Sequence, residues 1–183
     1  LSSSEAIIFV AVCLVAGTLE LAWFTNWVAA SLAVLTWISY VLAYTPLKVV
    51  SPINTAVGAV AGALPVLIGW TALGGSLDSR AMALFLVLFL WQFPHFMAIA
   101  WLYRRDYAQA GYQMLTVVDS TGSRAGRQSV IASLALIPIS ILPVLATPGM
   151  GSVLYVALAG LLGFAQLLIA ALFWQQPNDL RAR

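Results

Sequence analysis

Charged side chains are scarce in this chain. Asp, Glu, Lys and Arg make up only 8% of its 183 residues, and 62% of the residues are hydrophobic, whereas a soluble domain carries about 25% charged residues. So few polar side chains cannot cover a surface in water, which excludes an ordinary soluble domain and indicates a protein of the lipid bilayer. The single cysteine, Cys13, excludes a disulfide within the chain.

Several kinds of functional motif are also missing. The sequence has no P-loop, no dinucleotide-binding glycine pattern, no His-Glu-x-x-His and no cysteine-based metal motif. Its eight basic residues are too few, and lie too close to hydrophobic runs, for a nucleic-acid surface. The chemistry of this chain must therefore come from other side chains.

Long hydrophobic runs, by contrast, are plentiful. A helix that crosses the membrane needs roughly 20 mostly apolar residues. Backbone polar groups inside lipid must bond to one another, and helices satisfy this requirement. We therefore predict an all-α membrane protein, a polytopic helical bundle that forms a single domain over residues 1–183. Six segments qualify as spans: about Ser4 to Phe24, Trp27 to Tyr44, Ile53 to Leu73, Ser79 to Tyr103, Ser129 to Ala146 and Ser152 to Trp174.

The basic residues predict how the bundle is oriented. With six spans, seven of the eight basic residues fall on one side of the membrane, and only Arg80 falls on the other. The positive-inside rule assigns the richer side to the cytoplasm, or to the matrix of a mitochondrion. The loops after the second and fourth spans, which carry most of the polar side chains, are therefore predicted to open on that side.

The densest group of polar residues closes the fourth span, in "PHFMAIAWLYRRDYAQAGYQML". If the helix continued past this span, His95 and Asp106 would share one face, with the imidazole roughly 16 Å deeper in the membrane. Arg104 and Arg105 lie beside Asp106, and Asp119 adds a carboxylate to the same loop. Carboxylates and cations together suit a diphosphate and its Mg²⁺. An interfacial anchor is the alternative interpretation of the same cluster.

Three other polar residues are candidates. Tyr44 and Lys48 are four residues apart, so they share a face at a helix end; a membrane-surface anchor is the plainer interpretation. Asn54 begins the third span, where capping of the helix is the simpler role. His95 lies inside a span, where ionisable residues are uncommon and often functional, although Gln92 one turn away could simply satisfy it.

Two long motifs carry a resemblance to a known family. "YTPLK" with "SPINTAVGAVAGALPVLIGW", and then "FLWQFPHFMAIAWLYRRDYAQAGYQML", resemble the UbiA-type intramembrane prenyltransferases, in particular the heme O synthase (protoheme IX farnesyltransferase) branch. The resemblance implies a bundle of nine spans, with farnesyl diphosphate and Mg²⁺ at the cytoplasmic mouth. It implies heme b as the acceptor that enters from the bilayer, and heme O as a product for heme-copper oxidases. A heme A synthase or an oxidase-assembly protein would be a possible partner.

The resemblance also implies roles for individual residues. Tyr44 and Lys48 match the family's Tyr-x-x-x-Lys, and Asp106 matches its second acidic region, where Tyr103 stands in place of another aspartate. His95 belongs to the Pro-His-Phe segment of the heme branch. Lys48 and Asp106 are thus the expected catalytic residues, Asp106 also the Mg²⁺ ligand through the diphosphate. From their position in the spans alone, rather than from the resemblance, we expect Leu64, Trp70 and Phe93 to wall the prenyl site. The expected substrate-binding residues are Tyr44, Asn54, His95, Tyr103, Arg104, Arg105 and Tyr107.

One family motif has no counterpart in this sequence. The first acidic motif, Asn-x-x-x-Asp-x-x-x-Asp, belongs just before "LSSSEA", together with two helices, and the ninth helix belongs after Arg183. We expect the chain to be an internal fragment, inactive by itself. A quinone or chlorophyll precursor as acceptor, and a non-enzymatic transport or assembly protein, are the alternatives. The expected location is the bacterial plasma membrane, or the mitochondrial inner membrane in a eukaryote.

Overall fold

Helices account for all the regular structure of the part of the chain that the computed structural model describes, residues 2–145 and 153–182. Among these residues six helical spans are long and apolar enough to cross a membrane, which confirms the predicted all-α polytopic bundle. Three short helices lie outside the spans or extend one of them. The elements are α1 (Ser3–Phe24), α2 (Trp27–Ile38), the π-helical turn η1 (Ser39–Tyr44), α3 (Thr45–Leu47), α4 (Asn54–Ala72), α5 (Ser79–Leu102), α6 (Arg104–Gln109), α7 (Leu115–Val118), α8 (Ser123–Leu145) and α9 (Val153–Gln175).

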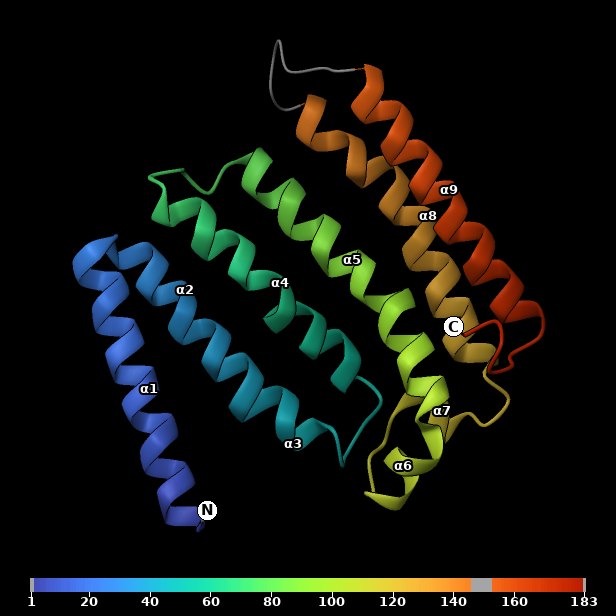
Figure 1. Ribbon diagram of the computed structural model, residues 1–183, viewed down its shortest axis with the longest axis horizontal. Helices are drawn as coiled ribbons and strands as arrows, with labels where there is room; N and C mark the ends of the chain where they lie inside the picture. The colour runs from blue at the N-terminus through green and yellow to red at the C-terminus, as the bar shows by residue number, and fades with distance from the viewer. Residues whose placement is uncertain (1, 146–152, 183) are drawn as a thin grey trace.

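The long helices follow one another across the molecule in chain order (Figure 1). Each packs against its neighbour in this order, α1 against α2, α2 against α4, α4 against α5, α5 against α8, and α8 against α9. The start of α1, the turn after α3, and the short helices α6 and α7 lie at one end of the bundle (Figure 1). This arrangement confirms that the polar loops after the second and fourth spans open on the same side.

Small residues allow the central helices to approach closely. Ala59 of α4 and Ala132 of α8 pack on either side of Phe93, and Leu64 packs with Leu67 and Ala81 where α4 meets α5. Close packing of small and large side chains is the main force between helices in lipid. Leu64 and Phe93 are therefore buried in helix contacts, and their role as walls of a prenyl site stays a prediction.

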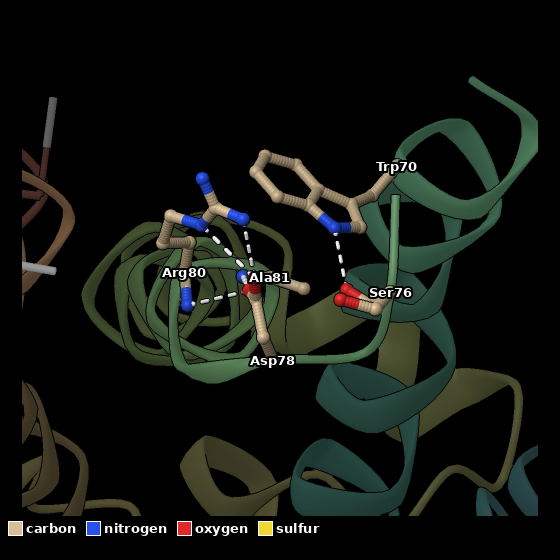
Figure 2. Close-up of polar contacts among 5 residues, drawn as sticks. All are labelled: Trp70, Ser76, Asp78, Arg80 and Ala81. Carbon is tan, nitrogen blue, oxygen red and sulfur yellow. Dashed lines mark hydrogen bonds and ion pairs between the residues drawn. The ribbon is translucent and has the colours of Figure 1, made fainter. Parts of the chain in front are cut away.

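The opposite end of the bundle is held by local polar contacts (Figure 2). Asp78 caps α5 by accepting hydrogen bonds from the backbone N–H groups of Arg80 and Ala81, and its carboxylate pairs with the Arg80 guanidinium at 2.6 Å. The Arg80 side chain, followed by the Ala81 N–H, lowers the pKa of Asp78. Trp70 donates to the Ser76 carbonyl at 2.7 Å. Trp70, near the end of α4, thus holds the outer loop that follows this helix, and its role as a wall of the prenyl site stays a prediction.

The start of the fifth span differs from its prediction. Helix α8 begins at Ser123, six residues before the expected Ser129. The reason is a cap: the Asp119 carboxylate accepts hydrogen bonds from the Thr121 hydroxyl at 2.6 Å and from the Arg124 N–H at 2.8 Å. The predicted span ends at Ala146 and Ser152 lie outside the described residues.

Candidate active site

The fourth span ends earlier than its sequence predicted. Helix α5 stops at Leu102, and α6 begins at Arg104 after a turn at Tyr103. Side chains occupy the last helical carbonyls: Thr116 Oγ1 donates to Ala100 O at 2.7 Å, and Arg104 Nη1 donates to Trp101 O at 2.6 Å. Because these acceptors no longer bind the N–H groups of a continuing helix, the chain turns. The prediction of one helix that aligns His95 with Asp106 is therefore wrong.

Two loops that are far apart in sequence are joined at the end of the bundle. The Gln113 N–H donates to the Lys48 carbonyl at 2.6 Å. The Asn54 amide donates to Ser51 O at 2.7 Å and to Gln113 O at 3.1 Å. The Asn54 side chain is fully buried, and Ile53 rather than Asn54 stands at the N-cap of α4 without a side-chain bond. Asn54 therefore ties the loop after α3 to the loop after α6, and the prediction that it caps a helix is wrong.

The Lys48 ammonium lies among aromatic rings. It sits 4.5 Å from the centroid of the Tyr44 ring, 5.8 Å from that of Tyr40 and 5.9 Å from that of Tyr112. The π-helical turn η1 carries both Tyr40 and Tyr44. It comes just before Pro46, whose missing N–H leaves the preceding turn short of a helical donor. The ring faces stabilise the cation without neutralising it, so Lys48 stays available to an anion.

A narrow cavity of about 230 Å³ lies beside this cation. Helix α4 contributes glycines and alanines to it, and Tyr44 and His95 line it as well. Gly58 and Gly62 are needed here for space: a Cβ at Gly58 would lie 2.8 Å from the Tyr44 ring, and one at Gly62 would overlap the Gln92 amide oxygen. The site thus combines a cation at the membrane surface with an apolar slot inside the bundle.

The remaining predicted residues of α6 divide into two groups. Asp106 and Arg105 are exposed at the same end of the bundle as Lys48, and the ion pairs found among the described residues involve neither of them. Arg104 instead pairs with Asp179 at 2.9 Å and stacks over the Trp101 ring at 4.3 Å. Arg104 therefore holds the segment after α9, while Arg105 and Asp106 are open to a ligand.

The tyrosines around α6 connect the two loops. Tyr103 is exposed, and the ring centroids of Tyr107 and Tyr112 are 6.1 Å apart. Partial burial raises the pKa of Tyr107, and the nearby Tyr103, Tyr112 and Asp106 raise it further. Tyr107, neutral at physiological pH like an ordinary tyrosine, can donate a hydrogen bond to an anion.

His95 is exposed on the face of α5 that lines the cavity. Its ring stacks on Trp91, with centroids 4.8 Å apart and planes 15° apart. Gln92, the expected partner of His95, donates instead to Ala59 O at 3.0 Å and to Leu88 O at 3.1 Å. The exposed imidazole thus borders the cavity, where a substrate could meet it.

Among the described residues, the side chains can supply a metal ion with few ligands. Residues 2–145 and 153–182 contain no group of three carboxylate, imidazole or thiol side chains close enough to hold an ion. Asp119 is occupied in the cap of α8, which together with the Thr121 hydroxyl lowers its pKa. Asp106 remains as one accessible carboxylate, which suits Mg²⁺ because that ion takes one or two carboxylates and its other ligands from phosphate and water.

The fold agrees with a solved membrane enzyme. The structure superimposes on one described as digeranylgeranylglyceryl phosphate synthase with a TM-score of 0.80, over 100% of this chain and 63% of the other, at 20% sequence identity. A likeness at this identity shows the fold. The profile of the UbiA prenyltransferase family matches residues 1–183.

The chain belongs to the UbiA prenyltransferase family.

Curated members of the UbiA family include close relatives. The chain is 50% identical over 134 residues to a protoheme IX farnesyltransferase of Koribacter versatilis, covering 73% of this chain and 43% of the relative. It is 45% identical over 163 residues to a protoheme IX farnesyltransferase of Solibacter usitatus, covering 89% of this chain and 55% of the relative. The chain thus spans about half the length of the curated relatives that it matches.

This UbiA-family site includes residues that the sequence interpretation missed. Tyr40 precedes Tyr44 and Lys48 by four and eight residues, a spacing that could have placed it on the same face. Tyr112 follows Gly111, whose φ of 73° makes the turn that brings Tyr112 back toward Lys48. Gln113 joins the site through its backbone alone, and no pattern of side chains could have indicated it.

Proposed function

We propose that this UbiA-family protein transfers a farnesyl group from farnesyl diphosphate to a vinyl group of heme b, producing heme O. The observation that carries the proposal is the Lys48 ammonium among the rings of Tyr44 and Tyr112, beside an apolar cavity and on the same end of the bundle as Asp106. A diphosphate with a hydrocarbon tail has the matching shape. The names of the curated relatives support farnesyl as the donor group and heme as the acceptor.

The reaction needs stabilisation of the negative charge on the departing diphosphate. It also needs exclusion of water from the farnesyl cation. The bond between farnesyl C1 and the diphosphate breaks, and its electron pair leaves with the diphosphate. The π electrons of the heme vinyl group form the new carbon–carbon bond, and a water molecule adds to the resulting cation and releases a proton. Cations fixed where the leaving charge grows lower this barrier, and the apolar cavity keeps other water from the farnesyl cation.

Individual residues would take separate parts in this reaction. Lys48, Arg105 and the neutral Tyr107 would bind diphosphate oxygens by charge-assisted hydrogen bonds. Asp106 would hold Mg²⁺, which when bound neutralises part of the diphosphate charge. Asn54 and Arg104 would act indirectly, since Asn54 joins the two loops and Arg104 holds the segment after α9.

The environment of His95 supports a heme acceptor over a quinone precursor, and the names of the curated relatives support heme over a chlorophyll precursor. An imidazole that stacks on Trp91 and borders an apolar cavity is suited to a metalloporphyrin. The protein would lie in a bacterial plasma membrane or a mitochondrial inner membrane, with the basic end in the cytoplasm or matrix.

The test uses the protein at its natural length in membranes, supplied with farnesyl diphosphate, Mg²⁺ and heme b. We expect heme O to form, and Asp106→Asn to reduce its rate at least about 100-fold. Glu5→Gln is the matched control, because Glu5 is a carboxylate at the same end that only caps α1. Full activity of Asp106→Asn with normal Mg²⁺ dependence would remove Asp106 from the metal site. If a prenylated quinone precursor forms and heme O does not, heme b is not the acceptor.

A further inference from the structure

A second cavity lies on the other side of His95. It has a volume of about 380 Å³ and is formed between α5, α8 and α9, within the range of about 300–1,000 Å³ typical of small-molecule sites. The cavity beside Tyr44, at about 230 Å³, is narrower. His95 lines both. The residues of the second cavity that concern its chemistry are Trp91, His95, Ser129, Gln166, Phe173 and Arg181.

The segment after α9 places a cation at this second cavity. Ala182 is buried in a cluster with Trp101 and Phe173, so the chain turns back onto the bundle after α9 (Figure 1). The Arg104–Asp179 pair holds the same segment from the side of α6. Arg181 is fixed by its own N–H, which donates to Asn178 Oδ1, and by Nη1, which donates to Leu172 O at 2.7 Å. A guanidinium has five N–H donors, so Arg181 retains donors for an anion.

The two cavities differ in what they can accommodate. The first is a slot between small residues of α4, with Lys48 at the surface, which suits a flexible chain on a diphosphate. The second is larger and offers aromatic rings, an imidazole and one guanidinium, which suits an apolar ring system with a carboxylate at its edge. An arginine is the side chain best matched to a carboxylate, because its donors form two parallel hydrogen bonds.

We propose that the second cavity holds the tetrapyrrole acceptor and that Arg181 binds one of its propionate carboxylates. This inference rests on the proposed function, since it assigns a place to heme b. Heme b carries its vinyl groups on the edge away from its propionates. With a carboxylate at Arg181, beside α9, the vinyl edge points past His95 toward the first cavity and the farnesyl group. His95, at the boundary of the two cavities, is the residue that both substrates approach.

The experiment measures binding separately from turnover. Heme b and its dimethyl ester, which lacks the carboxylate charges, are titrated into the purified full-length protein without farnesyl diphosphate, and binding is followed by the heme absorbance. We expect Arg181→Gln to weaken heme b binding about tenfold, to leave ester binding unchanged and to leave the KM for farnesyl diphosphate unchanged. Arg181→Lys should restore most of the affinity. Arg127→Gln removes the same charge from the same end of the bundle at an exposed position, and should change nothing.

A pair of cavity variants tests the division between the two sites. Ala165→Phe fills part of the second cavity and should weaken binding of heme b and of its ester, with farnesyl diphosphate binding retained. Gly62→Val fills the first cavity. It should weaken binding of farnesyl diphosphate and leave binding of heme b and of its ester unchanged. Unchanged heme b affinity in Arg181→Gln would overturn the inference, and so would a raised KM for farnesyl diphosphate, which would assign Arg181 to the diphosphate. If the unaltered protein forms no heme O, the proposed function itself fails; if it forms heme O while these variants bind heme b normally, only the present inference fails.

Discussion

Asn54 offers a sharp test of how the candidate site is assembled. Its amide donates two hydrogen bonds, one to Ser51 O and one to Gln113 O, from a fully buried position. Asn54→Ala removes both bonds and leaves the Gln113 carbonyl without this donor. At about 1 kcal/mol for each bond, the substitution should destabilise the protein by about 2 kcal/mol.

The more specific effect should be on catalysis. The Gln113 backbone bonds both Asn54 and Lys48, so loss of the amide loosens the loop of Lys48 relative to the loop of Asp106. Because transfer depends on placement of the diphosphate, we expect the KM for farnesyl diphosphate to rise at least about tenfold. Heme O formation by the full-length protein in membranes, at a temperature where the variant remains folded, measures this change.

Asn26 provides the matched control at the opposite end of the bundle. Its amide donates to Thr71 O at 2.6 Å, and its Oδ1 accepts from the Ala29 N–H as the cap of α2. Asn26→Ala should therefore cost about 2 kcal/mol of stability without a change in the KM for farnesyl diphosphate. If both variants lose activity equally at matched fractions of folded protein, the argument that Asn54 positions the site would be refuted.

Three further predictions concern separate parts of the chain. Gly62→Val should displace the Gln92 amide and shorten the first cavity, so a shorter prenyl diphosphate should become a better donor than farnesyl diphosphate in competition assays; unchanged preference would contradict the cavity assignment. Arg104→Ala breaks the ion pair with Asp179, worth up to about 1 kcal/mol at a surface, so residues 176–182 should be cut sooner in limited proteolysis; a protected segment would show that other contacts hold it. Asp119→Ala removes the cap of α8 and should cost about 1 kcal/mol at neutral pH. The hydrogen bonds from the Thr121 side chain and the Arg124 N–H lower the pKa of Asp119, so this contribution is complete above the ordinary aspartate pKa of about 4. The difference in unfolding free energy should shrink only below about pH 4, as the pH falls through the lower pKa of the folded state. A difference that grows in acid would refute the cap.

The two loops show where interpretation of the sequence succeeded. The Tyr44–Lys48 spacing predicted a shared face, and the structure places the ammonium over the Tyr44 ring. Gly111, a residue type that favours turns, makes the turn after α6 with a positive φ. Both features are local, because neighbouring residues on a helix or in a turn are positioned by the backbone conformation that their own residue types favour.

The same reasoning failed where a distant segment competes for a hydrogen bond. Helix α5 stops because Thr116 and Arg104 take carbonyls that a longer helix would use, so Asp106 is not aligned with His95. Asn54, at the start of a helix, bonds instead to Gln113, 59 residues further along the chain. No pattern within a single segment contains these partners.

The lengths of the hydrophobic runs were enough to specify a bundle of six helical spans, because backbone groups in lipid must hydrogen-bond to one another. The distribution of Lys and Arg was enough to place the polar loops on one side, because these residues favour one membrane face. Which side chains form the site was decided only when the helices packed. Burial of Asn54, the joining of the Lys48 and Gln113 loops, the two cavities that share His95 and the return of Arg181 to the bundle all arise from contacts between residues far apart in the chain. Such contacts depend on the complementary shapes of whole helices, which no local spacing encodes.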